Sequence, residues 1–280
     1  MAHALDLLIL VSIFGCVATI VSYLCIEAGI LHVAAAAFLG IGAYTYAIAR
    51  GAATSPLLAT AIAAVIGAVL GLGLAVLTLR LKGSQLALAT MGVGIVVYGF
   101  LLNATALTSG PMGRVIPAGP SRSATAVFGV ALLIVLIALV LLLERRAWGA
   151  RVRALRDDEE LSEDLGLQPR RLRLILFALT SSFLAVAGVV YAEVLRFIDP
   201  SSFTVAESVV VLAMALIIPI RTAFRGVGGA ALYVAIPEIL RFFGGGFRFE
   251  AELREVVFAT LLIVVVARGG FLPAPKKVAA

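Results

Sequence analysis

The chain is poor in charge, cysteine and tryptophan. Only 14% of its 280 residues are charged, whereas soluble domains carry about 25%, so an ordinary soluble domain is excluded. Its two cysteines, Cys16 and Cys25, lie inside one apolar run, with neither the spacing of metal ligands nor an evident role in a disulfide. We expect both to be small buried apolar residues.

A nucleotide-binding signature is also missing. No segment matches the Gly-x-x-x-x-Gly-Lys-Ser/Thr pattern that cradles nucleotide phosphates, so any ATP hydrolysis must come from a separate subunit. The acids at 157–160 are a conceivable Mg²⁺ site, but the sequence offers no second acid cluster to face them. We therefore expect no catalytic residue, metal or cofactor in this chain.

Long apolar runs dominate what is present, with 62% hydrophobic residues and a mean hydropathy of +1.13. Crossing a bilayer core takes about 20 apolar residues, so we expect an all-α polytopic membrane bundle of about eight or nine spans. Residues 1–280 form one transmembrane domain in this interpretation. The expected segments are 5–26, 31–49, 56–79, 86–107, 124–143, 174–195, 207–220, 226–243 and 255–267. The segment 207–220 is short, as broken helices that line a transporter cavity often are.

The basic residues predict how the chain is oriented. Placing the polar segment, residues 144–173, inside the cell gathers most of the 22 Lys and Arg on that side, which predicts a cytoplasmic C-terminus. The net charge of +6 then reflects cytoplasmic loops, and we expect no nucleic-acid partner. The N-terminus lies outside unless 5–26 or 31–49 is re-entrant. The Gly- and Pro-rich loop 108–123 predicts an ordered, turn-rich or re-entrant piece.

The polar segment has the pattern of a short docking helix. Asp157 and Glu160 are spaced like a capping box, Leu161 and Leu165 share one helix face, and Gly166 is typical of a helix end. We expect a helix of about eight residues that needs a docking partner, because helices this short are marginal in water. The alternative is an ordinary solvated loop with snorkelling arginines, and the residues alone leave both readings open.

Four stretches resemble the permeases of branched-chain amino-acid ABC importers. WGARVRALRDDEELSEDLGLQ resembles their coupling loop, at Gly149, Arg151, Ala154, Leu155, Arg156, Glu159 and Gly166. AAFLGIGAYTY at 36–46 resembles the signature of the family's second helix. Residues 77–103, followed by TSGPMG, and residues 198–213 resemble segments of the M-type subunit. Four matches in this order identify the chain as a member of that family, of the M-type.

The resemblance implies a non-catalytic permease subunit in the inner membrane that moves branched-chain amino acids, or a related small amphipathic solute, by alternating access. It implies a second permease subunit, two cytoplasmic ATPases and an extracytoplasmic solute-binding protein as partners, besides the lipid bilayer. The ATPase-coupling residues would be Arg151, Arg156, Asp157, Glu159, Glu160, Leu161, Leu165 and Gly166. The translocation path would include His32, Phe38, Gly40, Gly42 and Tyr44.

The sequence departs from the family at two places. His32 stands where Ser is usual, Ala34 and Ala35 replace Gly and His, and Ile218–Arg221 replaces a glycine-rich run. The alternative function is a stand-alone secondary carrier or channel, although it would leave the polar segment without an evident purpose. A membrane enzyme is a third hypothesis, which the lack of a convergent catalytic cluster disfavours.

Other intramembrane residues have structural interpretations. Asn103, Glu193, Glu207 and Glu238 lie near the ends of expected spans, where interfacial snorkelling or helix capping is the expected role. Three glycine pairs predict close helix packing: Gly40 and Gly42, Gly67 and Gly71, and Gly92 and Gly94. A cavity-lining role for Gly40 and Gly42 is the alternative.

Overall fold

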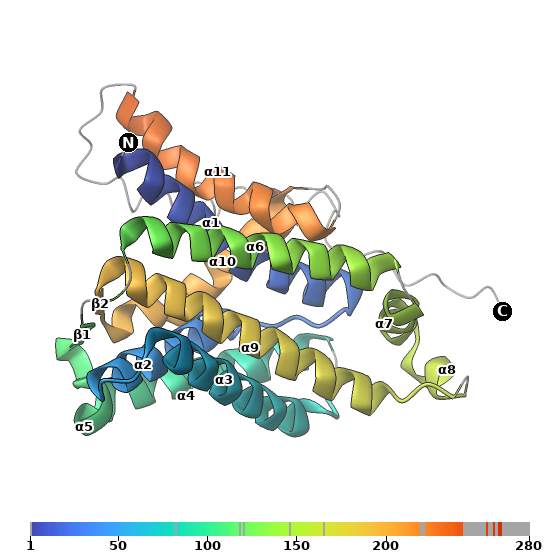
Figure 1. Cartoon of the computed structure of the whole chain (residues 1–280). Helices are drawn as coiled ribbons and strands as arrows, with labels where there is room; N and C mark the ends of the chain where they lie inside the picture. Colours follow the sequence, from blue (N-terminus) through green and yellow to red (C-terminus); the bar gives the residue numbers. More distant parts are fainter. Residues whose placement is uncertain are drawn as a thin grey trace.

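The computed structural model describes residues 2–81, 83–117, 119, 121–145, 147–164, 166–218 and 222–242, together with 256, 260, 263 and 264. Long helices lie side by side in a bundle (Figure 1). They are α1 (Ala2–Ser22), α2 (Ala35–Gly51), α3 (Pro56–Thr78), α4 (Gly83–Asn103), α6 (Arg122–Arg145), α9 (Pro169–Leu195), α10 (Val205–Ile217) and α11 (Thr222–Phe242). The shorter elements are η1 (Tyr23–Glu27), α5 (Thr105–Thr108), η2 (Gly110–Met112), β1 (Arg114–Val115), α7 (Ala147–Asp157), α8 (Glu159–Asp164), β2 (Phe197–Ile198) and η3 (Pro200–Phe203).

The helical membrane bundle agrees with the expected fold class, but the expected number of eight or nine spans is not confirmed. In the described part of the chain, five helices are long and apolar enough to cross a membrane, and the bent pair α10–α11 adds a sixth span if counted as one. Most of the expected segment 255–267 lies outside the described residues. The two cysteines are buried among apolar neighbours, as expected.

The bundle has an inner and an outer set of helices. The first span, Asp6–Glu27, is formed by α1 and η1, and 72% of its most apolar stretch is buried, compared with 22% in α4 and in α6. Large apolar side chains on the outer faces are exposed, including Leu57, Leu77, Leu88 and Val127. Such extensive exposed apolar surface needs lipid or another subunit against it.

The segment before α2 differs from the continuous helix expected over 31–49. Residues 28–34 are not helical, although Ile30 and His32 are buried inside the bundle. The backbone N–H of Val33 donates to Thr90 Oγ1 at 3.1 Å, and that of Ala36 donates to a serine hydroxyl of α10 at 3.0 Å. Irregular backbone is tolerated at membrane depth where protein surrounds it, and these side chains supply the missing partners.

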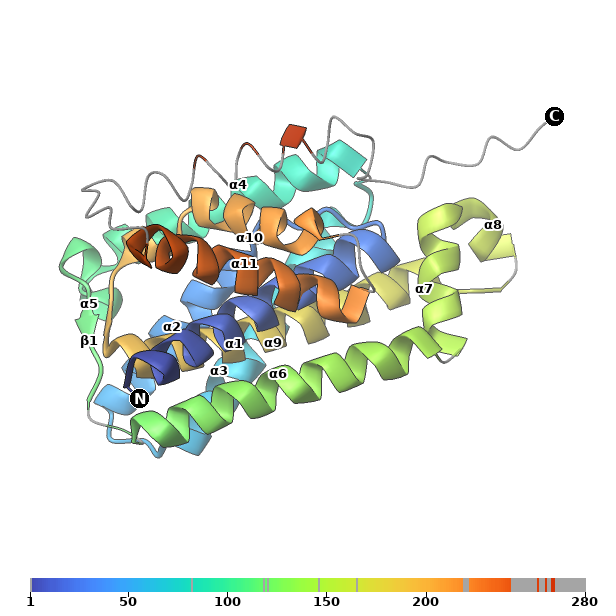
Figure 2. The ribbon, with the colours of Figure 1, turned by 90° about the horizontal axis from the view of Figure 1, so that it is seen from above.

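Short connections define two ends of the bundle, which we call the α7 end and the β1 end (Figures 1 and 2). At the β1 end, β1 pairs antiparallel with β2, with Arg114 opposite Ile198, so the loop 108–123 contains ordered turns as expected. Asp6 near the start of α1 pairs with Arg122 at the start of α6 at 3.0 Å. Helices α1 and α6 therefore both run from the β1 end to the α7 end.

Glycines bring the inner helices together. An added Cβ at Gly67 would lie 2.8 Å from the carbonyl oxygen of Ser181 in α9, and one at Gly71 would lie 2.5 Å from the Ser181 hydroxyl. Gly42 likewise faces the backbone of Ala185. The predicted packing role of these glycines is confirmed. For Gly92 it is wrong, because no described atom lies within 4 Å of an added Cβ.

Candidate functional site

The polar segment forms two helices rather than one. The prediction of a single helix starting at Asp157 is wrong, because α7 ends there and α8 follows after Asp158. The carbonyl oxygen of Asp158 accepts the N–H of Ser162 at 3.2 Å and its hydroxyl at 2.6 Å. Helix α7 forms earlier than predicted because Val152 and Leu155 share a buried face. Burial of that face stabilises a helix that the charge pattern alone did not indicate.

The end of α8 agrees with the prediction. Gly166 has a φ of +80°, the left-handed conformation that favours glycine, and the N–H of Leu167 donates to the carbonyl oxygen of Ser162 at 3.0 Å. This is the bonding pattern of a glycine-terminated helix. Leu165 and the side chains of Glu159, Glu160 and Leu161 lie outside the described part, so the Leu161/Leu165 docking edge stays a prediction.

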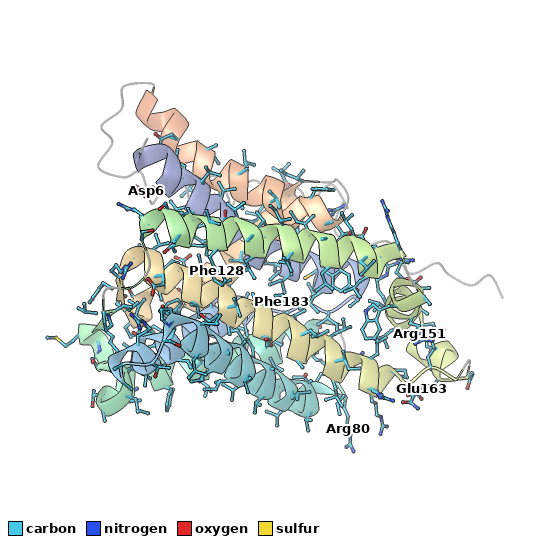
Figure 3. All side chains as sticks on the ribbon, viewed as in Figure 1. Asp6, Arg80, Phe128, Arg151, Glu163 and Phe183 are labelled. Carbon is cyan, nitrogen blue, oxygen red and sulfur yellow. The ribbon has the colours of Figure 1, made fainter. Side chains whose placement is uncertain are left out.

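Helix α7 is joined to the end of the first span. Arg156 Nη1 donates to the carbonyl oxygen of Ile26 at 2.6 Å, and Arg153 Nη1 lies 3.2 Å from Glu27 Oε2. Asp157 pairs with Arg156 at 2.9 Å. Of the residues predicted to couple the chain to an ATPase, Arg156 thus makes a contact within this chain, whereas the Asp157 side chain is 65% exposed. Arg151 is exposed and borders a groove of about 470 Å³ between α7 and the start of α9. Figure 3 shows Arg151 and Glu163 at this end of the bundle and Asp6 at the other.

A cavity of about 520 Å³ lies among α1, α2, α9, α10 and α11. Most of its wall is apolar, with Leu10, Phe14 and Val211 among the lining residues. Its carboxylates are those of Asp6, Glu207 and Glu238. Glu207 and Glu238, which were expected near span ends, therefore also border this cavity. The arrangement suits a small molecule with one apolar part and one cationic group.

The five residues predicted for the translocation path lie together in and around α2, but they do not line this cavity. His32 is fully buried, with ring centroids 5.7 Å from Phe38 and 5.6 Å from Phe177. Gly40 packs against the ring of Phe203, which also meets the ring of Tyr44. Helix α2 presents Ala36 and Leu39 to the cavity instead. These residues therefore lie outside the lining of the cavity, and their part in transport stays a prediction.

Two carboxylates have roles that the sequence did not reveal. Glu193 was expected to snorkel or cap, but its side chain is 6% exposed, accepts a hydrogen bond from the Tyr46 hydroxyl and pairs with Arg196 at 3.3 Å. Glu27 pairs with Arg153 and also accepts a hydrogen bond from the Thr222 hydroxyl at 3.0 Å. For Glu193 the arginine three residues later was an available signal. The partners of Glu27 are too far along the chain to be read from local spacing.

Comparison with known proteins agrees with the fold. Residues 3–266 match the family described as branched-chain amino acid transport system / permease component. The chain is 33% identical over 251 residues to the high-affinity branched-chain amino acid transport system permease protein LivM of Escherichia coli (strain K12), and equally to LivM of Salmonella typhimurium (strain LT2). The aligned part is 77% of this chain and 58% of each relative, so the chain spans a little over half their length. No solved structure matches it. The chain is a polytopic helical membrane protein that belongs to this family of branched-chain amino-acid transport permeases.

Proposed function

We propose that the chain is a permease subunit of an ABC importer, which moves a branched-chain amino acid or a related small amphipathic solute across the inner membrane. The observation that carries the proposal is the cavity of about 520 Å³ in a chain of this family. Small-molecule sites commonly have about 300–1,000 Å³. An apolar side chain would contact the wall, and an ammonium group would meet the carboxylates of Glu207 and Glu238.

The mechanism we propose is alternating access driven by separate ATPases. The chain contains no P-loop, so the energy has to arrive through a contact with other subunits. Helices α7 and α8 project from one end of the bundle (Figure 2), which suits a docking site for an ATPase. That end would be cytoplasmic, and the β1 end would face a solute-binding protein. The distribution of Lys and Arg favours a cytoplasmic C-terminus as well. The exposed apolar faces of α3, α4 and α6 suit lipid and a second permease subunit.

The docking role is tested by co-purification with the ATPase subunits encoded beside this chain. We expect the double variant L161D/L165D to lose the ATPases, because two carboxylates would replace the predicted apolar edge. The control is Met112→Asp, which places one acid on an exposed residue of η2 at the other end and is expected to retain them. A complex of L161D/L165D that survives, with unchanged solute-stimulated ATPase activity, would rule out this docking helix. ATP-independent transport by the isolated chain would instead favour a secondary carrier or channel.

A further inference from the structure

Glu27 occupies a junction of three elements at the α7 end. It is the last residue of the π-helical turn η1 that closes the first span, and its side chain is 13% exposed. Oε2 faces Arg153 of α7 at 3.2 Å, and Oε1 accepts the hydroxyl of Thr222, the first residue of α11, at 3.0 Å. One carboxylate therefore joins the polar segment to α11. π-helical turns occur frequently at functional sites.

The α7 side of this junction is firmly held. The guanidinium of Arg156 donates to the carbonyl oxygen of Ile26, one of the orphan acceptors at a helix end. The alkyl part of the same side chain lies over Gly29, where an added Cβ would be 2.6 Å from Arg156 Cγ. Helix α7 is thus attached to two successive residues of η1, Ile26 and Glu27. A displacement of α7 would therefore pull directly on the end of the first span.

The α11 side leads to the cavity. Helix α11 begins after the break that follows α10, and the two helices are bent by 120°. Gly226 of α11 meets the backbone of Thr19 in α1, and Gly229 meets the backbone of Met214 in α10. Further along, α11 presents Tyr233 and Glu238 to the cavity. Helices packed backbone to backbone transmit displacement rather than absorb it.

We propose that Glu27 is the positioning residue that passes movement of α7 and α8 to α11, and so to the wall of the cavity. The proposal rests on the proposed importer function. Removing the charge of Glu27 leaves the helices in place and weakens the link between them. ATP hydrolysis at the α7 end would then continue without moving the wall of the cavity.

The test compares variants of the purified complex with its ATPases, reconstituted in proteoliposomes. For Glu27→Gln, Arg153→Gln and Thr222→Val we expect assembly to persist, and leucine taken up per ATP hydrolysed to fall about fivefold or more, within the usual range of coupling factors. The reversed pair E27R/R153E is expected to recover part of the loss. The matched control is Glu193→Gln, which neutralises a buried, paired carboxylate at the β1 end and is expected to leave the ratio unchanged.

A distance measurement separates lost coupling from damaged folding. Spin labels at the exposed residues Ala150 of α7 and Phe224 of α11 are expected to change their separation on ATP binding in the wild type. In Glu27→Gln the change should be lost, with the melting temperature of the complex kept. A normal uptake ratio and a normal distance change in Glu27→Gln would overturn the role of Glu27. ATP-independent uptake by the wild type would instead overturn the proposed function.

Discussion

Buried carboxylates in this bundle are held by partners from distant parts of the chain. Glu193 accepts a hydrogen bond from the hydroxyl of Tyr46, which is 147 residues away in the sequence. Glu27 pairs with Arg153, which is 126 residues away in the sequence. A charged side chain inside a membrane protein is costly unless it is paired, so each pair fixes the relative position of two elements. Glu27 does this at the α7 end and Glu193 at the β1 end.

Glu207 and Glu238 border the cavity of about 520 Å³. If they bind the ammonium group of the solute, Glu207→Gln or Glu238→Gln should raise the solute concentration that half-saturates uptake about tenfold. Hydrogen bonds to charged groups contribute about 1.5–3 kcal/mol, which is the basis of this magnitude. Initial uptake rates over a leucine concentration series measure it. Glu193→Gln, outside this cavity, is the control, and wild-type saturation in both cavity variants would exclude the proposed contact.

Helix packing gives a prediction at the scale of elements. Gly42→Ala puts a methyl group against the backbone of Ala185, which cannot move aside, so we expect a loss of about 1–3 kcal/mol in stability. Gly92→Ala is the matched control within a helix, because no described atom lies near its added Cβ. Thermal unfolding in detergent should show a lower midpoint for Gly42→Ala alone. Equal midpoints for the two variants would contradict the close contact of α2 with α9.

The sequence predicted elements best where one residue type decides the structure. Gly166 ends α8 as predicted, and the glycines of α3 meet α9 as predicted. The irregular entry to α2 was missed because residues 28–34 are as apolar as a helix would be. Their conformation depends on hydroxyl groups from α4 and α10. The start of α7 was missed for a similar reason, since Val152 gains its stabilisation only when buried against the bundle.

At the scale of the whole molecule, the two ends of the bundle differ in kind. The α7 end carries the polar segment and the Glu27 junction. The β1 end carries the ordered loop with β1 and β2 (Figure 1) and Asp6 (Figure 3). The cavity is lined by α1, α2, α9, α10 and α11, which run along the bundle between these two ends. Of its carboxylates, Glu238 lies on α11, the helix whose first residue, Thr222, donates to Glu27. This architecture suits a chain that receives movement at one end and changes the access of a solute at the other.

ATP dependence of uptake by the reconstituted complex tests this account most directly. Proteoliposomes would contain the chain with the proposed second permease subunit and ATPases, and the proposed solute-binding protein and radiolabelled leucine would be added on the opposite side from ATP. We expect leucine accumulation that requires ATP and stops with an ATPase subunit inactivated in its own P-loop. Accumulation by the chain alone, driven by an ion gradient and indifferent to ATP, would contradict the account.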